Sequence, residues 1–162
     1  MILFRKLEDN DNDYNMLYKW CSKKHVYEWF EQRVLSFDEI KEKYKNKLKS
    51  NKEDLFIITY NNIDIGLVQI YRSDYYEDSY EYDLFIGEEE YLNKGIGTEI
   101  VNKINKMIYE NYNTNSIILR PFKRNQRAIS CYKKCNFKVI DEYNGYDTLN
   151  NPELITVLIS TK

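Results

Sequence analysis

The feature that most restricts the fold of this chain is a Gly-x-Gly loop between an apolar strand pattern and an amphipathic helix pattern. The stretch EYLNKGIGTEI places Gly95 and Gly97 one residue apart. It follows the strand pattern Tyr80–Ile86 and precedes Thr98–Asn111, where apolar residues recur at helical spacing. Glycines at a helix start let backbone N–H groups approach an anion, and the helix N-terminus adds about half a positive charge. The loop therefore predicts an anion-binding turn.

Two common phosphate-binding patterns do not fit this loop. The ATP-type pattern requires a lysine directly after its last glycine, whereas Thr98 follows Gly97 here. The dinucleotide pattern requires a third glycine at the position of Ile100. From spacing alone, an unliganded tight turn remains an equal alternative.

The other patterns predict one domain, residues 1–162, with an α/β fold. Its mixed central sheet of about seven strands is flanked by about four helices. Strands are expected at Ile2–Leu7, Leu55–Tyr60, Asp64–Tyr71, Tyr80–Ile86, Ser116–Leu119, Phe137–Ile140 and Leu154–Ile159. Helices are expected at Tyr14–Ser22, from the capping box Ser36–Glu39 to about Leu48, at Thr98–Asn111 and at Asn125–Lys134.

Composition argues against several classes of function. Charged residues make up 31% of the chain but leave a net charge of only −2, which does not favour nucleic-acid binding. No apolar run is long enough to cross a membrane, and the acidic start lacks the features of a signal peptide. Three cysteines without a secretory signal favour a reduced, cytoplasmic setting. Cys131 and Cys135 stand one helical turn apart, but with a single histidine we expect no metal site.

A second motif lies about thirty residues beyond the glycines, at Asn125–Phe137. Together with the loop it resembles the GNAT acetyltransferase superfamily, whose pattern Asn-x-x-Ala-x-x-x-Tyr-x-x-x-Gly-Phe is matched at Asn125, Ala128, Tyr132 and Phe137. Asn136 replaces the glycine of that pattern, and asparagine tolerates the left-handed conformation of a helix cap. Leu92 replaces a frequent Gln or Arg ahead of the loop.

From about Leu17 to Ile140 the chain is similar to the aminoglycoside 6'-N-acetyltransferase branch. The likeness lies in Leu17–Phe30, the hairpin Asn62–Tyr71 and the strand Tyr82–Glu88. It implies acetyl-CoA as acetyl donor and a small cationic primary amine, aminoglycoside-like or polyamine-like, as acceptor. The alternatives are another small amine, a protein N-terminus, or a catalytically weak acyl-CoA-binding protein. The oligomeric state stays open.

The resemblance implies the residues that hold the coenzyme. A backbone N–H on the strand before the loop, from Leu84 or Phe85, would polarise the thioester carbonyl, and the choice between them stays open. The full set of expected coenzyme contacts is Leu84, Phe85, Ile86, Asn93, Lys94, Gly95, Ile96, Gly97, Thr98, Asn125, Ala128 and Tyr132.

Two side chains are expected to move protons. Asp83 is the candidate base for the acceptor ammonium, with an exposed strand acid as the alternative. Tyr132 matches the family's general acid toward the coenzyme thiolate, although a buried helical tyrosine is equally typical of a core.

The acceptor is expected to meet an acidic, aromatic wall. The segment Asp74–Asp83, with Glu88 to Glu90 beyond it, contains no lysine or arginine and suits a polycation, or else forms a solvated loop. Arg120 stands where many related enzymes carry an aspartate, and close to an ammonium it would oppose binding by roughly 4 kcal/mol at 4 Å. The expected acceptor contacts are Trp29, Phe30, Tyr76, Glu81, Asp83 and Arg120; core packing is the alternative for Trp29 and Phe30.

Overall fold

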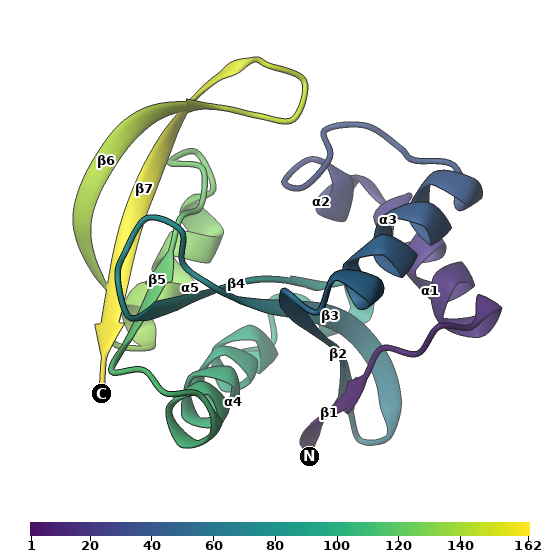
Figure 1. Ribbon diagram of the computed structural model, residues 1–162, viewed down its shortest axis with the longest axis horizontal. Coiled ribbons are helices and arrows are strands. Elements are labelled where there is room, and N and C mark those ends of the chain that lie inside the picture. Colours follow the sequence, from purple (N-terminus) through teal and green to yellow (C-terminus); the bar gives the residue numbers. More distant parts are fainter. The chain divides into compact units, whose positions relative to one another are not determined.

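Seven strands form one mixed sheet in the order β1-β2-β3-β4-β5-β7-β6. The structure is a computed structural model that describes all 162 residues (Figure 1). In chain order the elements are β1 (Ile2–Lys6), α1 (Asp11–Cys21), α2 (Lys24–Tyr27), α3 (Phe37–Ser50), β2 (Glu53–Tyr60), β3 (Ile63–Arg72), β4 (Ser79–Ile86), the 3-10 helix η1 (Glu89–Tyr91), α4 (Ile96–Asn111), β5 (Ser116–Leu119), α5 (Gln126–Lys134), β6 (Lys138–Tyr146) and β7 (Pro152–Thr161). The mixed α/β fold is thus confirmed.

The chain divides into two compact units. The first comprises Met1–Ile70 and Asp83–Tyr91, and the second comprises Tyr71–Tyr82 and Leu92–Lys162. Strand β4 contributes residues to both units. None of the helices is both long and apolar enough to pass through a membrane.

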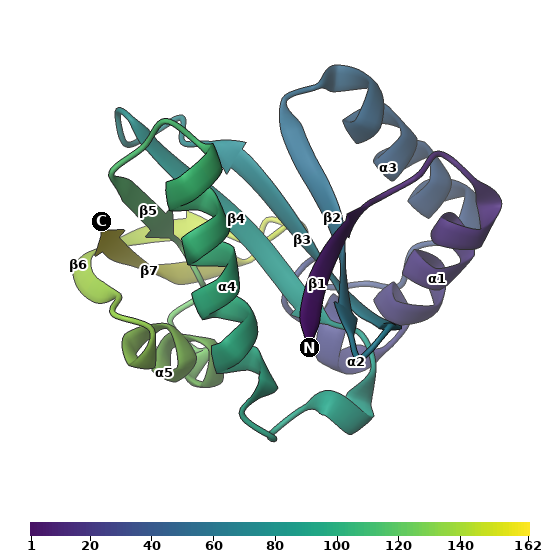
Figure 2. The ribbon, with the colours of Figure 1, turned by 90° about the horizontal axis from the view of Figure 1, so that it is seen from below.

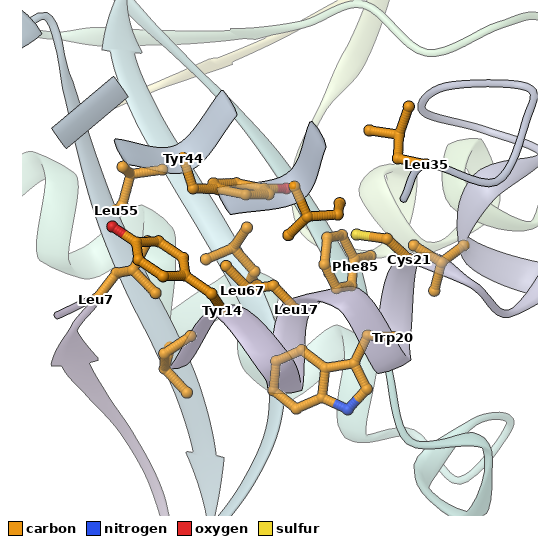
Figure 3. Packing of buried hydrophobic residues seen from close by; sticks show 13 residues of the cluster. Leu7, Tyr14, Leu17, Trp20, Cys21, Leu35, Tyr44, Leu55, Leu67 and Phe85 are labelled. Carbon is orange, nitrogen blue, oxygen red and sulfur yellow. The ribbon is translucent and has the colours of Figure 1, made fainter. Parts of the chain in front are cut away.

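The first unit is built around a hydrophobic cluster between α1, α3 and the strands β2 and β3 (Figure 3). Leu17 and Trp20 of α1 lie three residues apart and are fully buried, as are Ile40 and Tyr44 of α3. The predicted capping box begins α3: the Ser36 side chain accepts the N–H of Glu39, and the Glu39 side chain accepts that of Ser36. Burial of these apolar faces fixes the helices on the sheet.

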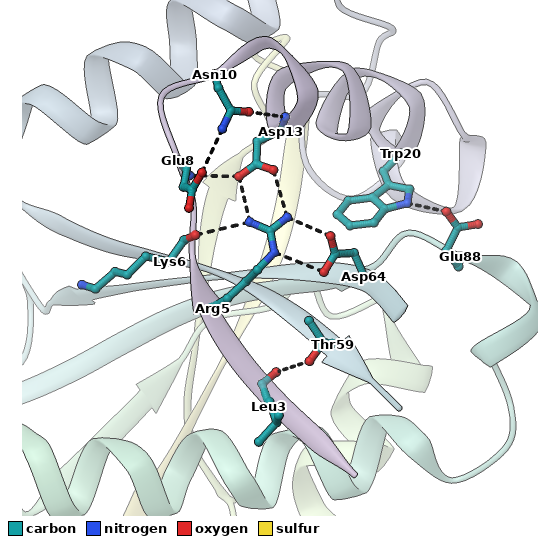
Figure 4. A network of polar contacts seen from close by, with 10 residues as sticks. All are labelled: Leu3, Arg5, Lys6, Glu8, Asn10, Asp13, Trp20, Thr59, Asp64 and Glu88. Atoms are coloured by element: carbon teal, nitrogen blue, oxygen red, sulfur yellow. Dashed lines mark hydrogen bonds and ion pairs between the residues drawn. The ribbon is translucent and has the colours of Figure 1, made fainter. Parts of the chain in front are cut away.

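A charged network joins three elements of this unit (Figure 4). Arg5 of β1 donates to both carboxylate oxygens of Asp13 on α1, each at 2.9 Å, and to Asp64 on β3. Asp13 is buried, and its second role is to accept the N–H of Glu8 at 2.9 Å. The hydrogen bonds that Arg5 donates to Asp13 and Asp64 raise the pKa of Arg5. Arg5 therefore holds the start of α1 against the sheet edge.

The second unit carries the C-terminal strands and two helices. Within it α4 and α5 lie side by side (Figure 2). Strand β5 pairs in parallel with the first half of β4 and antiparallel with β7, and β7 pairs antiparallel with β6. The buried Tyr82 side chain on β4 donates to Asn105 of α4 at 3.0 Å, which fixes that helix to the sheet.

Most predicted elements are confirmed, although several bounds differ; α1, for example, begins at Asp11 rather than at Tyr14. Helix α4 begins at Ile96, so Gly97 lies inside its first turn rather than before it. Helix α2 was not predicted, because four residues are too few for a helical period to be visible. Strand β6 runs on to Tyr146 through polar, exposed residues that its ladder with β7 holds extended.

Candidate functional site

The start of α4 leaves backbone donors without helical partners. Gly95 is the N-cap in the left-handed region, with φ 78°, and no side chain caps this end of the helix. The first helical bond runs from the Glu99 N–H to the Gly95 carbonyl at 3.3 Å. The N–H groups of Ile96, Gly97 and Thr98 therefore precede the helical ladder. With the helix dipole behind them, these N–H groups have the arrangement that an anion-binding turn requires, and anion binding stays a prediction.

Gly97 is not required for packing. A Cβ built on it would have the Cys131 Sγ as its nearest neighbour, at 3.9 Å, an ordinary van der Waals distance. Gly95 differs, because its positive φ strains any other residue. Packing therefore leaves room for a side chain at position 97, so the fold does not require a glycine there.

Helix α5 has the two ends that its motif predicts. The Asn125 side chain accepts the N–H of Ala128 at 3.3 Å, so Asn125 is the N-cap. At the other end the Phe137 N–H donates to the Tyr132 carbonyl at 3.1 Å, and Asn136 is left-handed with φ 67°. This is a Schellman motif with asparagine in the glycine position.

The first turn of α4 packs directly on α5. The Cys131 Sγ lies 3.7 Å from the Thr98 Oγ1, and the Cys135 thiol donates to the Thr98 carbonyl at 3.6 Å. Burial, together with the Cys131 thiol, raises the pKa of Cys135 to about 11, so this thiol stays protonated at neutral pH. The glycine loop and the helix that carries Tyr132 thus belong to one packed assembly.

Tyr132 itself is half-buried rather than buried, and its ring lies 5.8 Å from that of Phe137. This differs from the buried core tyrosine that was the alternative interpretation. Part of the side chain is exposed, as a group that exchanges a proton with a ligand requires.

In the first unit, the end of β4 lies unusually close to β3. The N–H groups of Gly87 and Glu88 both donate to the Ile65 carbonyl, at 2.7 and 3.3 Å. A Cβ on Gly66 would fall 2.2 Å from the Phe85 carbonyl oxygen, so only glycine permits this approach. The sequence contained a signal for this close approach that was missed, because an isolated glycine within a strand pattern, here Gly66, often marks it.

Asp83 shares a sheet face with the expected aromatic residues. Phe85, two residues further along β4, belongs to the cluster beneath α1 and α3, and alternation directs Asp83 to the same face. Burial raises the pKa of Tyr44 on α3, with a contribution from the charge of Asp83. Asp83 is exposed, while the Phe30 ring packs 5.4 Å from that of Phe85. Phe30 thus has the packing contact that was its alternative role, and Trp29 is half-buried.

Arg120 is not an unpaired cation. Its Nε donates to Glu81 Oε1 at 2.6 Å, its Nη1 donates to the Tyr143 hydroxyl at 3.0 Å, and its guanidinium lies over the Tyr75 ring. Burial lowers the pKa of Arg120, but the hydrogen bond and charge of Glu81 outweigh it and the net shift is upward. Glu81 balances the charge of Arg120, so the repulsion of a nearby ammonium should be weaker than an unpaired arginine would give; the effect of Arg120 on the acceptor stays a prediction.

Both carboxylate oxygens of Glu81 have hydrogen-bond partners. Its side chain is 2% exposed, and its second oxygen accepts the Ser73 hydroxyl at 2.6 Å. Tyr76 lies nearby in the same unit, and its pKa is raised by partial burial and then by the charge of Asp141. Of the predicted acceptor contacts, the structure brings Tyr76, Glu81 and Arg120 together, with Glu81 neutralised by its partner.

Glu88 also has a structural partner. The indole N–H of Trp20 donates to Glu88 at 2.8 Å (Figure 4), and Lys23 pairs with it at 3.3 Å. The Trp20 hydrogen bond, together with Lys23, lowers the pKa of Glu88. The acidic wall beyond β4 is therefore weaker than the sequence suggested.

The structure thus combines an α/β fold with an uncapped helix start at α4 that packs against α5. Residues 9–144 match the family model described as an acetyltransferase (GNAT) domain. The chain belongs to the GNAT acetyltransferase family.

Named relatives agree with this assignment. The spermidine N(1)-acetyltransferase of Vibrio cholerae is 30% identical over 111 residues, which is 67% of this chain and 63% of that enzyme. The aminoglycoside N(6')-acetyltransferase type 1 of Klebsiella pneumoniae is 26% identical over 141 residues, 79% of this chain and 70% of that enzyme. Among solved structures, aminoglycoside acetyltransferase AAC(6')-Ib in complex with coenzyme A superposes with a TM-score of 0.84 at 23% identity, over 100% of this chain and 95% of that one.

Proposed function

We propose that this protein is an acetyl-CoA-dependent N-acetyltransferase acting on a polycationic primary amine of the aminoglycoside type. The observation that carries the proposal is the uncapped start of α4, with Gly95 and Gly97, packed against the helix that bears Tyr132. The relative AAC(6')-Ib is described with coenzyme A, whose pyrophosphate is the kind of anion that such a turn accepts.

Each expected residue then has a role. The backbone of the glycine loop holds the pyrophosphate, Asn125 and Ala128 border the pantetheine arm, and a β4 N–H from Leu84 or Phe85 polarises the thioester carbonyl. Acetyl-CoA supplies an acetyl group activated as a thioester. Asp83 takes a proton from the acceptor ammonium.

The transfer step balances with these groups. The freed amine lone pair forms a C–N bond at the acetyl carbon while the C–S bond breaks. The departing thiolate takes a proton from Tyr132. After the C–N bond forms, the nitrogen still carries two protons; it loses one of them, which restores the Tyr132 hydroxyl through solvent, and Asp83 releases its own proton to water.

Charge on the second unit supports a cationic acceptor. The β3–β4 connection exposes Asp74, Glu77 and Asp78, with Tyr75 exposed by 72% among them. Arg120, which lies over the Tyr75 ring, is neutralised by Glu81. Asp78 is paired with Arg72 at 3.4 Å, which leaves Asp74 and Glu77 as the exposed acids. An exposed acidic and aromatic surface attracts ammonium groups by charge and by cation–π contact.

A polyamine is the second candidate acceptor. Its support is the 30% identity to the Vibrio cholerae spermidine enzyme, which exceeds the 26% identity to the aminoglycoside enzyme. Another small amine, a protein N-terminus, or acyl-CoA binding with weak catalysis remain the competing functions.

A thiol-release assay with acetyl-CoA and an amine panel separates these functions. The panel contains kanamycin, spermidine, simple amino-acid amides and a peptide with a free N-terminus. Turnover of kanamycin supports the proposal, turnover of spermidine without kanamycin supports the polyamine candidate, and turnover of the peptide alone contradicts both. Tight acetyl-CoA binding without turnover of any amine would identify a binding protein instead.

Gly97→Val tests the coenzyme loop. We expect acetyl-CoA to raise the melting temperature of the wild type, and the variant to lose this rise because its Cβ blocks the backbone from the pyrophosphate. The unliganded variant should melt near the wild type, since the space beside Gly97 is open to 3.9 Å. Differential scanning fluorimetry measures both temperatures. An unchanged rise in the variant would place the coenzyme elsewhere.

Arg120→Ala tests whether Arg120 serves structure or charge repulsion. Removing one partner of a buried ion pair costs about 3–5 kcal/mol, and since Arg120 is 22% exposed we expect about 2–3 kcal/mol. The double variant Arg120→Met, Glu81→Leu should recover most of that loss, because no uncompensated charge remains. Urea unfolding gives both values. A gain in kanamycin affinity without loss of stability would restore the repulsion hypothesis.

A further inference from the structure

Gln69 is a buried polar residue that the fold does not explain. It stands in β3, an inner strand of the sheet, with 5% exposure, and its Oε1 is buried without a hydrogen-bond partner. The other such atom, His25 Nδ1, lies 3.4 Å from the Glu89 carboxylate, which can pair with it. A leucine at position 69 would fill a similar volume without burying an unpaired oxygen. The amide therefore indicates a function other than packing.

Two backbone bonds fix what lies opposite Gln69 in the β3–β4 hairpin. At one end the Gly87 N–H donates to the Ile65 carbonyl at 2.7 Å, and at the other the Ser73 N–H donates to the Ser79 carbonyl at 2.9 Å. Both bonds give the same antiparallel register. Counting along it from either end sets Gln69 opposite Asp83.

The same register shows which face the two side chains share. It pairs Leu67 with Phe85, and both belong to the apolar cluster beneath α1 and α3 (Figure 3). Side chains two residues apart on a strand point to the same face. Gln69 follows Leu67 by two residues and Asp83 precedes Phe85 by two, so Gln69 and Asp83 also face that side. Directly opposed residues have Cβ atoms roughly 4.5–5.5 Å apart, so both side chains can reach one bound atom.

We propose that the Gln69 side-chain carbonyl accepts an N–H of the acceptor nitrogen whose proton Asp83 removes. The proposal rests on the function proposed above and adds the residue that selects primary amines. A primary ammonium has three N–H bonds. Asp83 takes one proton, Gln69 Oε1 accepts a second N–H, and the freed lone pair is turned toward the thioester.

Selectivity follows from the number of N–H groups. A secondary ammonium has only two N–H bonds, so it satisfies Asp83 and Gln69 together only in the one rotamer that turns its methyl group away from both. Every staggered rotamer of a primary ammonium offers an N–H to each of the two groups. Gln69 thus favours primary over N-methylated amines.

The test compares wild type with Gln69→Leu, and with Gln69→Met as a second variant of similar volume. The amines are spermine with its terminally N-methylated derivative and kanamycin with its 6'-N-methyl derivative. We expect Gln69→Leu to keep or raise the melting temperature, to lower kcat/KM for the primary amine about tenfold, and to reduce the preference over the methylated amine. The KM for acetyl-CoA should stay unchanged.

Thr59→Val is the matched control, because Thr59 is also a buried polar residue of this sheet but has a partner, the Leu3 carbonyl at 3.4 Å (Figure 4). It should change stability and leave amine preference as in wild type. Wild-type kinetics and preference in Gln69→Leu, or a fall in stability that accounts for its lower activity, would overturn the proposal. A wild type that acetylates no amine would instead refute the function on which it rests.

Discussion

Tyr132→Phe should lower turnover at pH 7 at least about tenfold, and toward the 10²–10⁴ typical of a lost general acid. The departing coenzyme thiolate loses its proton donor, while the phenylalanine ring keeps the contact with Phe137 at 5.8 Å. Because the substitution removes only the hydroxyl, the affinity for acetyl-CoA should stay within a few-fold. Steady-state kinetics with the best amine of the panel measure turnover, and calorimetry measures coenzyme affinity.

Tyr109→Phe is the matched control for this prediction. Tyr109 also lies in the second unit, on α4, and its hydroxyl donates to Ser160 at 2.9 Å. Removing it should cost about 1 kcal/mol of unfolding free energy and leave turnover unchanged. If Tyr132→Phe folds and turns over like wild type, Tyr132 serves packing alone.

The features that the sequence predicted well are those decided by chemistry within a few residues. Asn61 and Asn62 follow the predicted strand Leu55–Tyr60, and because asparagine tolerates positive φ the sequence predicts a tight hairpin there; their φ angles are 49° and 67°. Asn136 supplies the left-handed cap of α5 for the same reason. The capping box and the Asn125 cap likewise depend on side chains that reach their own helix. Such features are visible in a short window of sequence.

The features that the sequence missed depend on residues far apart in the chain. Arg120 and Glu81 are 39 positions apart, and only the parallel pairing of β4 with β5 brings their strands together. The need for Gly66 arises from the Phe85 carbonyl on the next strand. The role proposed for Gln69 depends on the β3–β4 register, which sets it opposite Asp83. A charged or polar residue in an apolar strand indicates that such a partner exists, but the sequence does not show which residue it is.

The pairing of Arg120 with Glu81 changes what can be inferred about the acceptor from Arg120. Taken alone, an arginine in place of an aspartate argues against a polycationic substrate. In the structure, Arg120 is paired with the buried Glu81 and lies over the exposed Tyr75 ring, so the pair carries no net charge. A charge substitution in this family therefore has to be interpreted with its partner, because the pair and not the single residue sets the local potential.

Asp83→Asn should lower kcat/KM most at neutral pH and least at alkaline pH. An acceptor amine with a pKa near 10 is neutral in about one molecule in a thousand at pH 7 and about one in ten at pH 9. The wild type uses the Asp83 carboxylate to remove the ammonium proton, whereas the amide of the variant cannot accept it. The variant therefore depends on amine that is already neutral. We expect about a 100-fold loss of kcat/KM at pH 7 that shrinks to about tenfold or less at pH 9.

The pH profile distinguishes a base from a mere electrostatic contact. If Asp83 only attracted the ammonium, its loss would raise KM at every pH at which the amine is charged and would leave kcat nearly unchanged. Asp54→Asn, a change of the same kind at an exposed acid of the first unit paired with Lys6 at 3.3 Å, should give a profile parallel to wild type. A parallel profile for Asp83→Asn as well would assign proton removal to water or to another residue, and with it would remove the partner that gives Gln69 its role.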